Sequence, residues 1–196
     1  GGLCFVCLNR TAPGVIENTL PGRIFIGEFF GSYRERTISI VELFERAGIE
    51  CYFSRSLDES LWRKLVWNIP FNGLAIAAGG VDTQKLLQSP HLTLLARMLM
   101  EEVQEAARAY GHDIPPSFLQ SQLDEPRHMG PYKPSSLLAF LADRAVEVEA
   151  IFGEPLRRGQ AKGVAMPHLE ALTLLLKGLC KGPHQQATQH KHPKHS

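Results

Sequence analysis

The sequence predicts a mainly α protein, in which an all-helical domain follows the last strands of an incomplete α/β domain. Three short runs typical of strands lie within residues 1–55, whereas from residue 56 onward the apolar residues recur at helical spacing. The last stretch of the chain is almost without apolar side chains and cannot offset its ordering entropy. We therefore expect two domains, over 1–55 and 56–182, and a disordered tail over 183–196.

The amino-terminal part is predicted to be the closing portion of an α/β sheet. Its strand-like runs are LCFVCL, RIFIGE and IECYFS, at residues 3–8, 23–28 and 49–54. Residues 37–48 have apolar side chains at helical spacing and end in Gly48, which suits a C-terminal cap. Three strands and one helix make a poor independent domain, and the sequence begins in a strand. We therefore expect the α/β part to be truncated at its amino end.

The remaining helices are predicted from capping and stop signals. Ser56 opens an S-x-x-E capping box, and the helical pattern that follows runs to about Ala78, before a Gly-Gly pair. Two further helices are predicted over 90–110 and 167–179. Residues 135–158 also have helical periodicity, with a kink or break expected at Pro155.

Two expectations concern the middle of the chain. Residues 114–134 hold five prolines, which predicts a turn-rich connection with at most a short helix. In the helix over 90–110, three glutamates are most simply a solvated face, opposite a predicted apolar stripe. The glutamates are Glu101, Glu102 and Glu105, and the stripe consists of Leu94, Leu95, Met98, Leu99, Val103 and Ala106.

Composition limits the classes of partner. The 196-residue chain is 44% hydrophobic, which is enough for a sizeable core, and its 21 basic and 20 acidic residues leave a net charge of +1. Such a chain has no global field that would attract nucleic acid or anionic lipid. No apolar run approaches the roughly 20 residues that span a bilayer, and the amino end lacks the charged start of a signal peptide. We expect a cytoplasmic protein that binds a small molecule, with no nucleic-acid or membrane partner.

Two patterns suggest a metal site, but neither is sufficient to predict one. In CFVC, Cys4 and Cys7 lie three apart on a predicted strand and so point to opposite faces, which favours buried, reduced cysteines. The tail GPHQQATQHKHPKHS holds four of the eight histidines and could bind a transition metal adventitiously. The sequence predicts no physiological metal site.

The segment LWRKLVWNIPFNGL, residues 61–74, combines polar and apolar residues in an unusual way. Lys64, Asn68 and Asn72 follow i, i+4, i+8 spacing, so they form one stripe on a helix that is otherwise apolar nearly all round. Pro70 removes one backbone hydrogen bond and favours a bend beside the stripe. Either the stripe lines a cleft, or Lys64 reaches solvent along its stem while the two amides tie neighbouring helices. Spacing alone leaves both alternatives open.

A second polar cluster lies later in the chain, in YKPSS (132–136) and AVEVEAIFGEP (145–155). Glu147 enters an otherwise apolar helix start, where a carboxylate gains from the positive end of the helix. It is either a simple capping residue or a functional acid.

These residues together resemble the ketopantoate reductase (2-dehydropantoate 2-reductase) family. LWRKLVWNIPFNGLAI is similar to the W-x-K-L-x-x-N-x-x-x-N helix that carries the catalytic lysine of the family. KPSSLLAFLADRAVEVEAIFGEPLRR and KGVAMPHLEALTLLLK resemble its serine loop, its glutamate-bearing helix start and its closing segment. The resemblance extends over roughly residues 1–180. It implies a 6-phosphogluconate-dehydrogenase-like helical domain for substrate binding and dimerisation, after the end of an NADP-binding Rossmann domain.

The resemblance also implies a reaction, the reduction of 2-dehydropantoate to pantoate by NADPH in pantothenate and coenzyme A biosynthesis. By position, Lys64 is the general acid that protonates the ketone oxygen, Asn68 and Asn72 bind the substrate, and Ser135 binds its carboxylate end. Glu147 lies where cofactor and substrate meet. A developing alkoxide needs a proton donor nearby, and fixed amides orient the hydroxy acid for hydride transfer. The family commonly forms homodimers.

Three features depart from the family pattern. The chain has no G-x-G-x-x-G, so the turn that grips the cofactor phosphates is absent, and we expect the fragment alone to bind NADPH weakly and to be inactive. Ala139 replaces an acidic residue four positions after the family's serine, and Asp82 stands near the position of a further substrate-binding asparagine in the family pattern. The alternatives are therefore a related 2-oxo acid reductase, or a helical dimerisation or binding module without catalysis.

Overall fold

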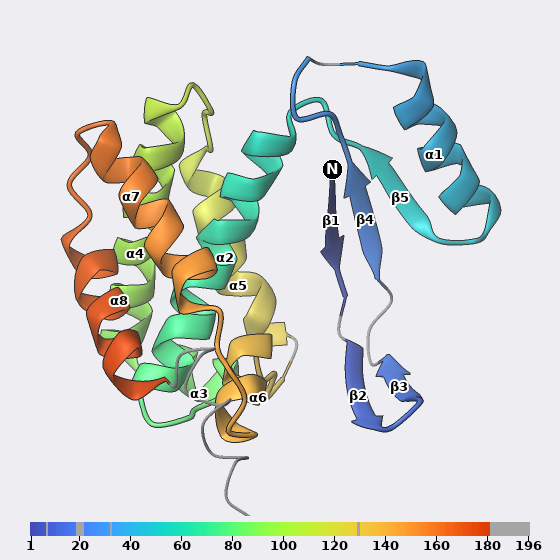
Figure 1. Cartoon of the computed structure of the whole chain (residues 1–196). Helices are drawn as coiled ribbons and strands as arrows, with labels where there is room; N and C mark the ends of the chain where they lie inside the picture. Colours follow the sequence, from blue (N-terminus) through green and yellow to red (C-terminus); the bar gives the residue numbers. More distant parts are fainter. Residues whose placement is uncertain (7, 19–21, 32, 129, 181–196) are drawn as a thin grey trace, which may run out of the picture. The chain divides into compact units, whose positions relative to one another are not determined.

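The computed structural model describes the chain except for residues 7, 19–21, 32, 129 and 181–196. The chain forms two compact units, Gly1–Leu61 and Trp62–Ser196 (Figure 1). Strands are confined to the first unit and helices dominate the second among the described residues, so the predicted mainly α fold is confirmed. The predicted disorder of 183–196 concerns residues outside those described, and the division into domains stays a prediction.

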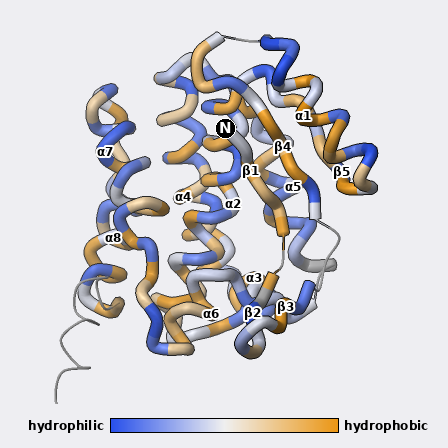
Figure 2. Tube along the Cα trace, turned by 45° about the vertical axis from the view of Figure 1, so that its right-hand side comes forward, coloured by the Kyte–Doolittle hydropathy of each residue, from blue (hydrophilic) through white to orange (hydrophobic). Residues whose placement is uncertain are grey.

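The first unit contains a three-stranded sheet and one covering helix. Its strands are β1 (Gly2–Phe5), β4 (Arg23–Ile26) and β5 (Glu50–Phe53), in the order β1-β4-β5. β1 is antiparallel to β4, and β4 is parallel to β5 across the connecting helix α1 (Glu35–Arg46). A parallel pair needs such a crossover, so this is one βαβ unit. β4 is hydrophobic over most of its length (Figure 2).

The sequence prediction missed a hairpin in the first unit. β2 (Leu8–Ala12) and β3 (Val15–Asn18) pair antiparallel around Pro13 and Gly14, and Gly14 has φ 77°, a turn conformation that suits glycine. The predicted strand over 3–8 was therefore too long, since β1 ends at Phe5. The expectation that the cysteines are buried was wrong for Cys4, which is exposed, and right for Cys51; Cys7 lies outside the described residues.

The second unit is built from helices. The helix α2 (Leu57–Ala77) begins in the first unit and leads into the second. The other elements are α3 (Thr83–Gln88), α4 (Pro90–Ala109), α5 (Pro116–His128), α6 (Ser135–Leu141), the π-helical turn η1 (Glu149–Gly153), α7 (Glu154–Ala161) and α8 (Pro167–Leu179). α4 contacts α3, α5, α7 and α8.

The predicted helix signals of α2 are confirmed. The Ser56 hydroxyl accepts a 3.2 Å hydrogen bond from the Glu59 backbone N–H, which is the cap expected at its start. At its end, Gly79 and Gly80 have φ 89° and 85°, so the chain leaves the helix there. The helix continues through the buried Pro70 without interruption.

Three helix predictions were wrong. Residues 114–134 contain the 13-residue helix α5, because Pro116 lies in its first turn, where its missing N–H has no helical acceptor. The predicted helix over 135–158 breaks after Leu141, where Asp143 has φ 52°, and not at Pro155. Pro155 lies in the first turn of α7, directly after η1, a position at which proline is tolerated.

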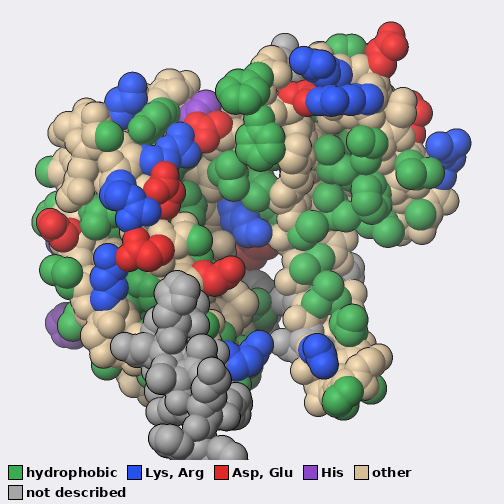
Figure 3. Space-filling model, in the orientation of Figure 1, with side chains coloured by type: hydrophobic (Ala, Val, Ile, Leu, Met, Phe, Trp, Pro, Cys, Tyr) green, Lys and Arg blue, Asp and Glu red, His purple; other side chains and the backbone are tan. Residues whose placement is uncertain are grey.

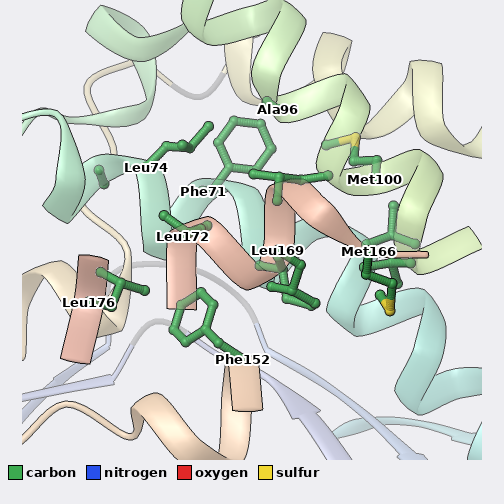
Figure 4. Close-up of a cluster of buried hydrophobic side chains, with 14 of the residues drawn as sticks. Phe71, Leu74, Ala96, Met100, Phe152, Met166, Leu169, Leu172 and Leu176 are labelled. Carbon is green, nitrogen blue, oxygen red and sulfur yellow. The ribbon is translucent and has the colours of Figure 1, made fainter. Parts of the chain in front are cut away.

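The core of the second unit is one cluster of buried apolar side chains to which most of the helices contribute. α2 contributes residues on every side of its axis, as its composition predicts, and α4, η1 and α8 close around it (Figure 4). The largest fully buried side chains include Trp62, Phe71, Leu99, Phe152 and Leu169.

Exposed apolar side chains gather on the first unit (Figure 3). Phe29 and Phe30, in the loop after β4, are 71% and 89% exposed. On α1 only Thr37 and Val41 are buried, so most of the apolar residues predicted for its face are accessible.

Candidate functional site

The three polar residues of α2 lie in graded environments. Lys64 and Asn68 are half-buried, whereas Asn72 is 2% exposed. The stripe thus descends into the helical unit from the lysine to the second asparagine. A buried amide requires hydrogen-bond partners, because leaving one unsatisfied costs on the order of 1–3 kcal/mol.

Asn72 has these partners within the protein. Its Oδ1 accepts a 3.0 Å hydrogen bond from the Ser136 backbone N–H, and its Nδ2 donates to the Asn68 carbonyl at 3.0 Å. The first bond satisfies an N–H in the first turn of α6, which its N-cap residue, Pro134, cannot satisfy with a side chain. Asn72 therefore ties α2 to the start of α6. This is the structural role that the sequence left open for the amides.

Ser135 is brought to α2 by this contact. It is the first residue of α6, its side chain is exposed, and it precedes the buried Ser136. The segment before it is also held: the Tyr132 ring lies 5.9 Å from the Trp67 ring, and the Tyr132 carbonyl accepts from the Thr83 N–H at 2.9 Å. The start of α6 is thus fixed against α2 and α3.

Glu147 lies at a helix start, as predicted, with an exposed side chain. Its backbone carbonyl accepts a 3.0 Å hydrogen bond from the Ile151 N–H, so it opens the turn that leads into η1. The contacts that link Asn68, Asn72 and Ser136 do not involve it.

Two of the three departures from the family pattern, Asp82 and Ala139, have local structural explanations. The Asp82 carboxylate accepts a 2.8 Å hydrogen bond from the Lys85 N–H and caps α3. Ala139 packs partly buried against the core, where a carboxylate would need a partner.

The sequence prediction missed a polar cluster formed by Glu102 and the start of α8. The prediction of a solvated face on α4 was wrong for Glu102. Glu102 is 8% exposed, and its two oxygens accept 2.9 Å hydrogen bonds from the backbone N–H groups of His168 and Leu169. His168 Nδ1 lies 2.6 Å from Glu102 Oε1. These N–H groups belong to the first turn of α8, whose N-cap residue, Met166, offers no side-chain acceptor. Glu102 on α4 therefore caps α8.

The Glu102 cluster borders an open hollow of about 570 Å³ between α4 and the segment before α8. The one buried carboxylate that lines this hollow, Glu102, already accepts hydrogen bonds from the first turn of α8. Within the residues that the structure describes, no group of three or more His, Cys, Asp or Glu side chains is placed to hold a metal ion. None of the described helices is long and apolar enough to cross a membrane.

In this structure a helical unit carries a Lys-Asn-Asn stripe, half-buried at Lys64 and Asn68 and buried at Asn72, and it follows a βαβ unit in the chain. The family model described as "Ketopantoate reductase PanE/ApbA C terminal" matches residues 56–179. The chain belongs to this ketopantoate reductase family.

Individual relatives support the assignment to this family. The chain is 38% identical over 184 residues to a 2-dehydropantoate 2-reductase of Nostoc sp., covering 91% of this chain and 57% of that protein. Crystal structures of 2-dehydropantoate 2-reductases from Geobacter metallireducens and Methylococcus capsulatus match with TM-scores of 0.87 and 0.85 at 36% and 34% identity. The Geobacter match covers 91% of this chain and 60% of the Geobacter chain. The Methylococcus match covers 95% of this chain and 58% of the Methylococcus chain. The chain spans little more than half the length of these relatives and corresponds to their C-terminal portion.

Proposed function

We propose that this chain is the substrate-binding part of an NADPH-dependent reductase that converts 2-dehydropantoate to pantoate. The observation that carries the proposal is the arrangement on α2. Lys64 and Asn68 lie half-buried on the stripe whose deepest member, Asn72, holds the start of α6 and with it the exposed Ser135. This arrangement places an ammonium, an amide and a hydroxyl on elements that the Asn72 hydrogen bonds connect.

In the proposed reaction, Lys64 is the catalytic acid. As the hydride that NADPH would supply adds to the C2 carbonyl carbon, the C=O π bond would open and the Lys64 ammonium would give one N–H proton to the carbonyl oxygen. Lys64 would become a neutral amine, and the alkoxide would never develop full charge. Asn68 donates a hydrogen bond to the substrate, and Ser135 binds its carboxylate. We assign Asn72 chiefly to positioning, because its amide already binds protein groups on both sides.

NADPH would supply the hydride. Of the groups that could hold it, this chain offers the exposed Glu147 carboxylate at a helix start, which suits hydrogen bonds from hydroxyl or amide groups. The sequence has no G-x-G-x-x-G turn. We therefore expect the isolated chain to bind NADPH weakly and to turn over little substrate. The complete enzyme is expected to be a cytoplasmic homodimer.

A chimeric enzyme tests the proposal. The amino-terminal portion of the Nostoc relative, up to the residue that aligns with Gly1, is fused to this chain, and NADPH oxidation is followed with 2-dehydropantoate. We expect turnover, and a loss of roughly 10²- to 10⁴-fold in kcat for Lys64→Ala. Lys85→Ala, on α3, is the matched control and should leave kcat unchanged. Full turnover by Lys64→Ala would refute the catalytic role.

The substrate is tested in the same chimera. A related 2-oxo acid reductase is the second candidate, since Asp82 and Ala139 depart from the family pattern. Comparing kcat/KM for 2-dehydropantoate with that for 2-oxo acids lacking its hydroxymethyl group decides between the two. A higher value for the simpler acids would overturn the assignment of 2-dehydropantoate.

A further inference from the structure

Two half-buried aromatic rings border the polar stripe of α2. Trp67 follows Lys64 by three residues and directly precedes Asn68, and its side chain is partly accessible. Side chains three positions apart are neighbours on a helix surface, with roughly 5–6 Å between their Cβ atoms. The second ring is that of Tyr132, whose centroid lies 5.9 Å from that of Trp67. We call Trp67 and Tyr132 the aromatic pair.

Both rings of the aromatic pair are anchored within the second unit. The fully buried Phe71 ring lies 4.9 Å from the Trp67 ring, one turn further along α2. The backbone of Tyr132 is held on both sides, because its N–H donates to the Gly130 carbonyl at 2.8 Å and its carbonyl accepts from the Thr83 N–H at 2.9 Å. Rings that are fixed before a ligand arrives offer apolar area at little entropic cost. The aromatic pair is therefore a preorganised apolar surface.

The other tryptophan of α2 has a different environment. Trp62 lies about 160° round the helix from Lys64, is fully buried, and has its ring 5.8 Å from that of Tyr110. The same helix thus buries one indole completely, whereas it leaves Trp67 partly accessible beside an ammonium and an amide. Accessible apolar side chains next to a few fixed polar groups are typical of a small-molecule site.

The proposed substrate has an apolar part that such a surface would bind. In a 2-oxo acid the C2 carbonyl lies between the carboxylate and C3, and 2-dehydropantoate carries two methyl groups on C3. When Lys64 and Ser135 bind the carbonyl oxygen and the carboxylate, C3 projects to the remaining side of the carbonyl. Trp67 adjoins Lys64 on α2, and Tyr132 precedes Ser135 by three residues. The aromatic pair therefore borders both of these anchors.

We propose, resting on the reductase function proposed above, that the aromatic pair receives the C3 substituents of the substrate and selects 2-oxo acids whose C3 is fully substituted. Trp67 and Tyr132 are then specificity-determining residues, which contact the substrate beside the reacting carbon and take no part in proton transfer. In an apolar site each added methyl group changes kcat/KM by about tenfold or more. Pyruvate, in which C3 is a bare methyl group, should therefore be a poor substrate.

The chimeric enzyme tests the inference with two acids that differ only at C3. Trimethylpyruvate and pyruvate share the carboxylate and the carbonyl, and only the former has methyl groups on C3. The wild-type chimera should have a kcat/KM for trimethylpyruvate at least about a hundredfold higher than that for pyruvate. Trp67→Ala should reduce this ratio at least about tenfold, whereas Trp67→Phe, which keeps an aromatic ring, should retain most of it. Because both acids are measured on one preparation, any misfolded fraction of a variant cancels from the ratio.

Tyr132→Ala and Tyr110→Ala are a matched pair of variants, because each removes a half-buried ring that lies a similar distance from a tryptophan of α2. Tyr132→Ala should lower the ratio, and Tyr110→Ala should leave it unchanged. A chimera that reduces 2-dehydropantoate but does not prefer trimethylpyruvate to pyruvate would overturn the inference alone, as would a wild-type ratio in Trp67→Ala. A chimera that reduces no 2-oxo acid would instead overturn the proposed function, and this inference with it.

Discussion

The Asn72 side chain accepts a 3.0 Å hydrogen bond from the backbone N–H of Ser136, a residue 64 positions later in the chain. Replacing Asn72 with Ala removes this bond and the one to the Asn68 carbonyl, and leaves a buried N–H without a partner. We expect the free energy of unfolding to fall by about 1–3 kcal/mol. Urea unfolding followed by the fluorescence of Trp62 and Trp67, both in the second unit, measures the change.

The control for this prediction is Asn68→Ala. Asn68 lies one turn earlier on the same helix and is only half-buried, so its loss should cost less than about 1 kcal/mol. In the chimeric enzyme the order should reverse for substrate binding, with Asn68→Ala raising KM more than Asn72→Ala. Equal stability losses for the two variants would contradict the structural role of Asn72.

The cap on α8 gives a second prediction. Glu102→Ala leaves the N–H groups of His168 and Leu169 without their carboxylate acceptor, so we expect a loss of about 2–4 kcal/mol. The comparison is Glu105→Ala, on the same helix, which removes only the exposed ion pair with Arg108 and should cost at most about 1 kcal/mol. The same fluorescence-detected unfolding distinguishes them, and a Glu102 variant as stable as the wild type would refute the capping role.

Glu28 in the first unit gives a pH-dependent prediction. Hydrogen bonds from Arg36 and then Thr37 lower the pKa of its carboxyl to about 2 from its usual value near 4.5. Because the folded pKa is the lower one, the ionised carboxylate stabilises the fold above about pH 4.5, and this contribution is lost as pH falls toward about 2. Calorimetric unfolding of the wild type and Glu28→Gln should show a difference at pH 7 that shrinks over this range.

A double-mutant cycle that combines Glu28→Gln with Arg36→Gln tests whether the stabilisation by Glu28 comes from its interaction with Arg36. Arg36 donates to both Glu28 oxygens, at 3.1 and 2.8 Å, so the coupling between the two substitutions should vanish at low pH together with the stability difference. A difference between wild type and Glu28→Gln that is the same at pH 7 and pH 3 would show that the carboxylate charge contributes nothing.

Gly73 provides a packing prediction. A Cβ at this position on α2 would lie 2.6 Å from Leu172 Cδ2 and 2.9 Å from Phe152 Cε1, within the cluster of Figure 4. Helix propensity favours alanine over glycine by about 1 kcal/mol. The overlap in a close-packed core outweighs this gain, so Gly73→Ala should destabilise by about 1–3 kcal/mol in urea unfolding. A more stable variant would mean that α8 can shift to make room.

Local signals in the sequence predicted the parts of the fold that depend on neighbouring residues. The Ser56 capping box, the glycine stop after α1 at Gly48, with φ 74°, and the start of α8 at Pro167 all act within one or two helical turns. The missed hairpin also had such a signal, because Pro13-Gly14 lies between two strand-like runs.

Features that depend on distant partners could not be predicted from the same signals. Glu101, Glu102 and Glu105 on α4 have the composition of a solvated face, and only the packing of α8 against α4 shows that Glu102 is different. Likewise, spacing placed Asn72 in the polar stripe, whereas its partner in α6 is set by the tertiary fold. For Lys64 and Ser135, the sequence supplied both position and proposed role, and the chimeric enzyme tests them.

The remote cap on α8 also bears on the order of folding events. Because the acceptor for its first N–H groups lies 66 residues earlier, on α4, a synthetic peptide of residues 167–179 alone would lack its N-terminal cap. Isolated helices of this length are marginal in water. Helix α8 should therefore become persistent only when it docks on a formed α4, late in folding, and substitutions at its buried leucines, such as Leu172→Ala, should change the unfolding rate more than the refolding rate.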